Sequence, residues 1–219
     1  MALSSTLFPH LSLFNATFHQ PSPPLIATEL SGIFIQHKYS NTLSHIVCGF
    51  WYNSAIHQKV RIDETYDGGY GTSFFDYTNT SSSGGVSNVQ VIVGPSMNST
   101  PSCFEDYVGS PGFPLITATY LQDVNASFGG AVLDPWVGEV QSWDFLYGGG
   151  GDGGIAVVVY LDDQEPAVLQ GYDFWGTAER TKVVTRFFAQ KVGEIGAEVF
   201  AGIGCPEQKQ SAEAPRSDM

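Results

Sequence analysis

The chain has 219 residues, a formal net charge of -13 at pH 7, 25 glycines and 12 prolines. This length fits one large domain and excludes a multidomain assembly. Only 14% of the residues are charged and 13% are aromatic, which is typical of short strands joined by turns, so we expect an all-β fold. With 9 basic against 22 acidic residues, the surface would repel nucleic acids and anionic membranes.

The predicted elements follow an N-terminal arm. Residues 1–26 contain several prolines and are expected to be irregular, residues 27–207 form the predicted β domain, and residues 208–219 are expected to be a disordered tail. Turn residues and the alternation of apolar and polar residues place strands at residues 27–39, 45–52, 56–62, 71–78, 86–93, 115–120, 124–133, 137–147, 155–161, 167–175 and 181–188.

Other stretches are expected to connect these strands. The long connection 94–114 is predicted to be irregular, and the glycine run 148–154 to be a flexible hairpin loop. Residues 193–202 are expected to form a final turn or a short helix. Because so many strands in one domain must close or curl, the sequence predicts a barrel, a half-barrel or a two-sheet sandwich.

The cellular location is indicated by sequons rather than by a leader. No apolar run is long enough to span a membrane, and the N-terminus lacks the basic region of a secretory signal. Four N-glycosylation sequons begin at Asn15, Asn79, Asn98 and Asn125, where chance predicts about one. They favour a glycosylated extracellular protein, and Ser/Thr-rich loops that contain asparagine by chance are the alternative.

Three cysteines, Cys48, Cys103 and Cys205, are widely separated along the chain. The C-x-x-C spacing of zinc ribbons and redox motifs is therefore absent. One disulfide and one odd thiol is the simplest oxidised state, and spacing alone allows all three pairings. The odd cysteine would be buried, which is the commoner case, or would face a partner chain.

The sequence contains no motif of an enzyme active site. It lacks a nucleophile elbow, a phosphate-binding loop, a dinucleotide fingerprint and a zinc-protease motif. Its five histidines all lie in the first 57 residues and are not paired at metal-ligand spacing. We therefore expect no catalytic residues and no organic cofactor.

Several acidic residues offer the oxygen ligands that calcium prefers. None of them follows EF-hand spacing, and carboxylates solvated in turns are the alternative. These candidates are Asp63, Glu64, Asp67, Asp152, Asp162, Asp163 and Glu165.

Aromatic residues are the main candidates for a binding site. On the predicted strand 137–147, Trp143, Phe145 and Tyr147 share one face, which is too bulky to be left wet. Aromatic residues of other strands are expected to meet them around an apolar pocket, and an ordinary aromatic core is the alternative. The candidate ligand-binding residues are Phe50, Tyr52, Phe74, Trp143, Phe145, Tyr147, Tyr172 and Phe174.

Two blocks of the sequence resemble ependymin-related proteins. Gln58-Lys-Val-Arg-Ile-Asp is similar to the family's block on an early hairpin, and Val184-Thr-Arg-Phe-Phe, followed by a Val-Phe pair and Cys205, is similar to its closing block. The resemblance spans residues 27–206. It implies two stacked, curved antiparallel sheets that form a half-barrel with an apolar pocket, similar to bacterial lipoprotein carriers. By position it also implies a disulfide between Cys103 and Cys205, whereas Cys48 has no counterpart.

The resemblance also implies a function. Members of the family are secreted or lysosomal glycoproteins, often dimeric, and are linked to lipid binding and to calcium. We therefore expect a non-enzymatic protein that holds a lipid or another amphipathic molecule between two sheets. A carbohydrate-binding module for cell-matrix adhesion is the alternative, and an enzyme is the third hypothesis. Aromatic side chains around an enclosed cavity would favour lipid, and aromatic side chains at a shallow open groove would favour sugar.

Overall fold

The structure is a computed structural model. It describes residues 20–42, 44–66, 68–94, 100–109, 113–147, 154–176, 181–202 and 205. Several sequence predictions lie outside these residues: most of the arm, the whole tail, the glycine run up to residue 153, and the candidates Asn15, Asp67, Asn98 and Asp152. Across the described ranges, no helix is long and apolar enough to cross a membrane.

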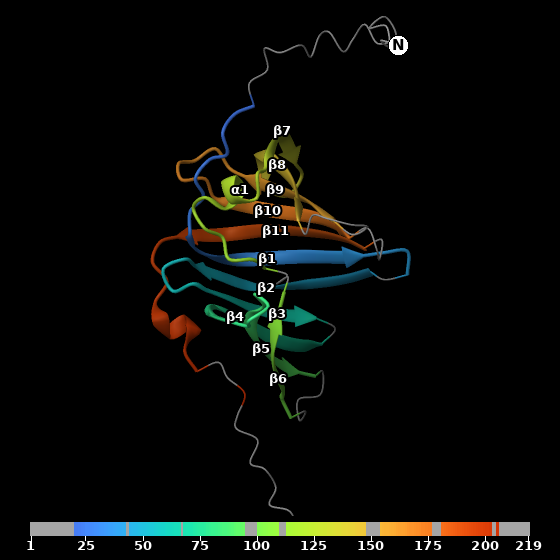
Figure 1. The fold of residues 1–219 in the computed structure, drawn as a ribbon. Coiled ribbons are helices and arrows are strands. Elements are labelled where there is room, and N and C mark those ends of the chain that lie inside the picture. Colours follow the sequence, from blue (N-terminus) through green and yellow to red (C-terminus); the bar gives the residue numbers. More distant parts are fainter. Residues whose placement is uncertain are drawn as a thin grey trace, which may run out of the picture. The chain divides into compact units, whose positions relative to one another are not determined.

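The described residues form an all-β fold, as predicted (Figure 1). A short helix, α1 (Tyr120–Asp123), and a 3-10 turn, η2 (Ala197–Phe200), accompany the strands. The strands are β1 (Glu29–Tyr39), β2 (Ser44–Ser54), β3 (Lys59–Tyr66), β4 (Gly69–Thr80), β5 (Val86–Val93), β6 (Ser102–Val108), β7 (Ser127–Asp134), β8 (Gly138–Tyr147), β9 (Ile155–Leu161), β10 (Leu169–Gly176) and β11 (Thr181–Val192).

Hydrogen bonds join these strands in one open sheet rather than in two sheets. The order in the sheet is β6-β5-β4-β3-β2-β1-β11-β10-β9-β8-β7. Two separate sheets were expected, but β1 and β11, the first and last strands of the described residues, are neighbours in one sheet. That pairing makes the hydrogen-bonded ladder continuous from β6 to β7.

Two local predictions were wrong. Residues 115–119 form no strand but lead into α1, because the backbone of Ile116 bonds to the side chain of Asn53 instead of to a neighbouring strand. Conversely, residues 102–108, predicted to be irregular, form the strand β6, which pairs with β5 in antiparallel register. The predicted short helix within 193–202 is confirmed as η2.

The chain divides into two compact units. Unit 1 comprises Met1–Ala27, Lys38–Ser44 and Ala118–Arg186, and unit 2 comprises Thr28–His37, His45–Thr117 and Phe187–Met219. The boundary between the units passes through β1 and β11, so each of these strands contributes residues to both.

In unit 1, β8 buries the side chains of Trp143 and Phe145, which are 1% and 7% exposed, whereas Asp144 between them and Leu146 after them are exposed. Burial therefore alternates as predicted at residues 143–146, but Val140 and Ser142 on the opposite face are also buried. The Tyr120 ring of α1 contacts the ring of Phe145 edge-on, with the centroids 6.0 Å apart, so α1 packs on the face of Trp143 and Phe145.

In unit 2, one sheet face is centred on Trp51 and is called the Trp51 face. Trp51 is 1% exposed and packs on Phe187, with the ring centroids 4.5 Å apart. The segment 113–117 is tied to this face by Asn53, whose side-chain amide donates to the carbonyl of Ile116 at 3.0 Å and accepts from its amide N–H at 2.8 Å. These bonds satisfy a buried loop backbone that has no strand partner.

The opposite face of unit 2, called the Phe74 face, is covered by residues 195–202 and by Cys205. Phe74 and Val89 form a buried apolar cluster with Ile195 and Phe200. Arg61 supports this cover, because its Nη1 donates to the carbonyl of Val199 at 2.7 Å.

The disulfide implied by the resemblance is present between Cys103 and Cys205. It ties β6 to the end of the segment that covers the Phe74 face. The odd cysteine, Cys48, is exposed, which corrects the expectation of a buried thiol. Its position explains the difference, because Cys48 belongs to the Phe74 face at a place where neighbouring Ile46 and Phe50 are also exposed.

Loss of the disulfide should destabilise unit 2. The loop it closes has a sequence separation of 102, for which chain entropy predicts a contribution of about 4 kcal/mol. We expect Cys103→Ser to lower the free energy of unfolding by about 2 to 5 kcal/mol in urea titrations. Cys48→Ser is the matched control and should leave it unchanged. Equal stability of the two variants would contradict a stabilising role for the disulfide.

Candidate functional site

The Trp51 face of unit 2 contains an open hollow of about 140 Å³. It lies over the strands β2 to β5, and most of its lining residues carry polar side chains. The residues that line it are His45, Glu64, Gly71, Thr72, Ser73, Gln90 and Ile92.

Glycines create the space around Glu64. In the strand register, Glu64 lies between Gly49 of β2 and Gly71 of β4. Neither neighbour carries a side chain, so the face is recessed on both sides of the carboxylate. Gly49 is also required for the close approach of β2 to β3, because a Cβ there would lie 1.8 Å from the carbonyl oxygen of Asp63.

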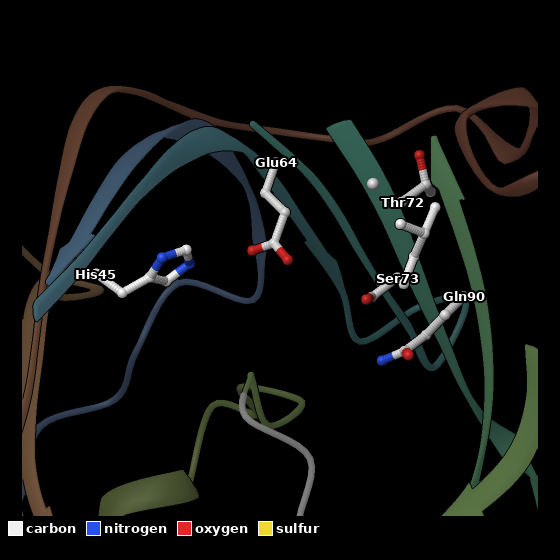
Figure 2. A pocket seen from close by; sticks show the side chains of 7 residues that line it. His45, Glu64, Thr72, Ser73 and Gln90 are labelled. Atoms are coloured by element: carbon white, nitrogen blue, oxygen red, sulfur yellow. The ribbon is translucent and has the colours of Figure 1, made fainter. Parts of the chain in front are cut away.

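The polar side chains reach the hollow from adjacent strands. Figure 2 shows that His45, Glu64, Ser73 and Gln90, which belong to β2, β3, β4 and β5, point into it. Thr72 points away, and its hydroxyl donates to Asp63 at 2.8 Å. The hollow therefore offers a carboxylate acceptor, and a hydroxyl and an amide that both donate and accept.

An aromatic residue that the sequence analysis did not select lies beside this site. Phe104 of β6 is directly opposite Gln90 in the antiparallel register, which places both side chains on the same sheet face. Its side chain is 55% exposed. Phe104 was missed because residues 94–114 were predicted to be irregular, so no face could be assigned to it.

The eight aromatic residues predicted to line one pocket lie in both units. Five of them, Trp143, Phe145, Tyr147, Tyr172 and Phe174, share one face of β8 and β10 in unit 1. Trp143, Phe145 and Tyr172 are buried there, and the rings of Tyr172 and Phe174 stack with centroids 6.2 Å apart.

The other three candidates, Phe50, Tyr52 and Phe74, belong to the Phe74 face of unit 2. Phe74 and Tyr52 pack against the cluster that contains Ile195 and Phe200 of the covering segment, and Phe50 is 52% exposed. None of the eight candidates lines the hollow. A single apolar pocket formed by all eight stays a prediction.

Two of the candidate calcium ligands, Asp63 and Asp162, make local interactions. Asp63 pairs with Arg61 at 3.0 Å, and Asp162 accepts hydrogen bonds from the backbone amides of Gln164 and Val168 at 3.2 and 2.7 Å. Among the residues the structure describes, no group of three or more His, Cys, Asp or Glu side chains is placed to hold a metal.

Unit 1 contains a buried ionic cluster around Arg186. Its Nε donates to Asp134 at 2.8 Å and its Nη1 donates to Asp173 at 2.6 Å. The guanidinium lies over the Tyr160 ring, 4.4 Å from its centroid, and the Tyr160 hydroxyl donates to Asp173 at 3.1 Å. Gly171 makes room for this arrangement, because a Cβ there would lie 2.9 Å from Cδ of Arg186.

Burial and mutual charge shift the pKa values in this cluster. Burial, followed by the negative charge of Asp173, raises the pKa of Tyr160 to about 12. Burial alone would raise the pKa of Asp134, but the hydrogen bonds from Trp136 and Arg186 hold it below its ordinary value. The cluster therefore combines a guanidinium, the carboxyl groups of Asp134 and Asp173 and a phenol in mutual hydrogen bonds, an arrangement that is suited to structural support.

Comparisons with known proteins do not assign the chain to a family. No family model matches it, and no curated protein matches it. Among solved structures it is similar to a DUF1329 family protein from Desulfovibrio piger, with 6% sequence identity and a TM-score of 0.36. That similarity covers 80% of this chain and 90% of the other. At this level it supports no statement about function.

The raised pKa of Tyr160 predicts a loss of stability in alkali. Because the pKa rises from 10.0 to about 12 on folding, the stabilisation is complete below pH 10 and is lost as the pH rises through 12. A pKa difference of about two corresponds to a stabilisation free energy of about 2.7 kcal/mol, which the partial exposure of the Tyr160 ring reduces to about 1 to 2 kcal/mol. In urea titrations between pH 10 and 12, Tyr160→Phe should lose that much less stability than the parent. An equal loss of unfolding free energy in the parent and in Tyr160→Phe would contradict the prediction.

Proposed function

We propose that this protein is a non-catalytic binding domain that holds a small polar molecule in the hollow of unit 2. The observation that carries this proposal is the convergence of polar side chains from four neighbouring strands on one recess. Binding sites typically combine a concave surface with a few polar groups that fix the orientation of the ligand. A rigid sheet holds such groups at fixed spacing, which lowers the entropy cost of binding.

The size of the hollow supports a small ligand. Its volume is about 140 Å³, whereas sites for drug-sized molecules measure roughly 300 to 1,000 Å³. A long acyl chain would need a larger space with an apolar lining. The hollow is better suited to a single polar ring or a comparably small group.

The arrangement of the polar residues supports binding rather than catalysis. A serine becomes an effective nucleophile when a base lies within hydrogen-bond reach of its hydroxyl. Figure 2 shows His45 and Ser73 on opposite sides of the hollow, with Glu64 between them. Their strands, β2 and β4, are separated by β3. We therefore propose no enzymatic role for these residues.

Lipid binding in an ependymin-like half-barrel of two stacked sheets is the second candidate. Its support is the face of unit 1 on which five of the predicted aromatic residues lie together. The disulfide between Cys103 and Cys205 also agrees with that resemblance. A bound calcium ion and a homodimer belong to the same proposal. The polar lining of the hollow favours the first candidate.

We also propose that the protein acts outside the cytosol as a glycoprotein. Disulfides persist in oxidising compartments such as the extracellular space and the secretory pathway. The sequon residues Asn79 and Asn125 are both exposed, so their side chains are accessible to glycosylation. An extracellular or lysosomal location is compatible with both features.

Substitution of the polar lining should weaken ligand binding. Binding can be screened by saturation-transfer NMR with methyl glycosides, free amino acids and dicarboxylic acids, and dissociation constants can be measured by titration. Because hydrogen bonds to charged groups contribute about 1.5 to 3 kcal/mol, we expect Glu64→Gln to weaken binding about tenfold or more. Gln90→Ala should act in the same direction.

Glu105→Gln is the matched control for charge. Glu105 is an exposed carboxylate of β6 that lies opposite Val89 in the register, on the Phe74 face. The Glu105→Gln variant should bind ligand with the same affinity as the parent protein. If Glu64→Gln and Gln90→Ala also bind as the parent does, with unchanged melting temperatures, the hollow is not the binding site.

A further inference from the structure

We infer that the ligand of the hollow is a neutral saccharide, whose ring stacks on Phe104 while its hydroxyl groups bond to the polar lining. This inference rests on the proposed function and names its ligand class. It depends on the position and exposure of one aromatic side chain that belongs to neither buried core.

The register fixes the face to which Phe104 belongs. Gln90 of β5 pairs with Ser73 of β4 on one side and with Phe104 of β6 on the other. Side chains directly opposite one another in an antiparallel ladder project from the same face, about 5 Å apart. The Phe104 ring is therefore the next side chain after Gln90 in the row that lines the hollow.

Exposure distinguishes Phe104 from the aromatic core residues. On the same face, Trp51 and Phe75 are 1% and 5% exposed, whereas Phe104 is 55% exposed. A phenyl ring left in water carries a hydrophobic cost that scales with its apolar area. Covering this ring with an apolar surface of a ligand is therefore favourable. The side-chain amide of Gln90 beside it requires hydrogen-bonding groups at the edge of the same ligand.

A sugar ring meets both requirements. Its C–H groups form an apolar face that can lie on an aromatic ring, while its hydroxyl groups project from the edge and both donate and accept hydrogen bonds. The carboxylate of Glu64 accepts such bonds, and the Ser73 hydroxyl and the Gln90 amide can do both.

Charge disfavours an anionic ligand. Glu64 lines the hollow, and the whole chain carries a formal charge of -13. The net negative charge of the chain would repel a carboxylate or phosphate ligand. A neutral polyhydroxylated molecule is not repelled, and it uses the carboxylate as an acceptor.

The test measures the binding of cyclic and acyclic polyols to variants of β6. The probes are the methyl glycosides of glucose, galactose, mannose and N-acetylglucosamine, with sorbitol as the acyclic comparison. We expect Phe104→Ala to weaken glycoside binding about tenfold and to change sorbitol binding by less than twofold. Phe104→Tyr, which keeps the stacking ring, should bind glycosides as the parent does.

Tyr107→Ala is the matched control for loss of an aromatic ring. Tyr107 is also on β6 and is 48% exposed, but it lies opposite Ser87, on the Phe74 face. The Tyr107→Ala variant should bind glycosides with the same affinity as the parent protein. Equal weakening in Phe104→Ala and Tyr107→Ala would show a general effect on β6 and would overturn the inference.

The remaining outcomes separate the inference from the proposed function. If amino acids or dicarboxylic acids bind in a Glu64-dependent manner and no glycoside does, the saccharide inference is overturned and the proposed function stands. If glycosides bind but Phe104→Ala retains full affinity, stacking is overturned. If none of the polar probes binds, both fail.

Discussion

The two faces of an antiparallel sheet both need a cover, and this constraint organises unit 2. Strand alternation sends Trp51 to one face and Phe74 to the other, so neither face can be left wholly in water. The covers are irregular segments rather than a second sheet. Asn53 ties one cover through the backbone of Ile116, and Arg61 and the disulfide tie the other. Hydrogen bonds from side chains to the backbone of these covering segments thus take the place of the backbone hydrogen bonds that a second sheet would supply.

The hollow follows from the same alternation. On the Trp51 face, Trp51, Ile62 and Phe75 are buried, whereas Glu64, Ser73 and Gln90 are partly exposed and line the hollow. Glycines flank Glu64 at this transition. The hollow is therefore formed where the buried core of the unit ends, on the strands that also carry the core. Its geometry is as rigid as the sheet that presents it.

The local alternation of apolar and polar residues predicted the positions of the strands better than it predicted which strands are neighbours in the sheet. The alternation at Trp143 and Phe145 identified a buried face because a strand's period is visible in the sequence. Which strands share a face across the sheet depends on register, and register is set by pairings distant in the chain. The register shows that Tyr172 and Trp143 share a face of the sheet, a fact that the pattern within either strand does not contain. Phe104 was missed because the neighbouring Glu105 and Asp106 concealed the strand pattern of β6.

The pairing of β1 with β11 has a consequence for biosynthesis. The amide of Gly193 donates to the carbonyl of Glu29 at 3.0 Å, and β1, the first strand of the described residues, lies beside β11, the last of them. Until β11 is synthesised, β1 presents an open edge to other nascent chains. Non-local pairings of this kind close slowly. Synthesis of the chain through β11 must therefore precede completion of the sheet.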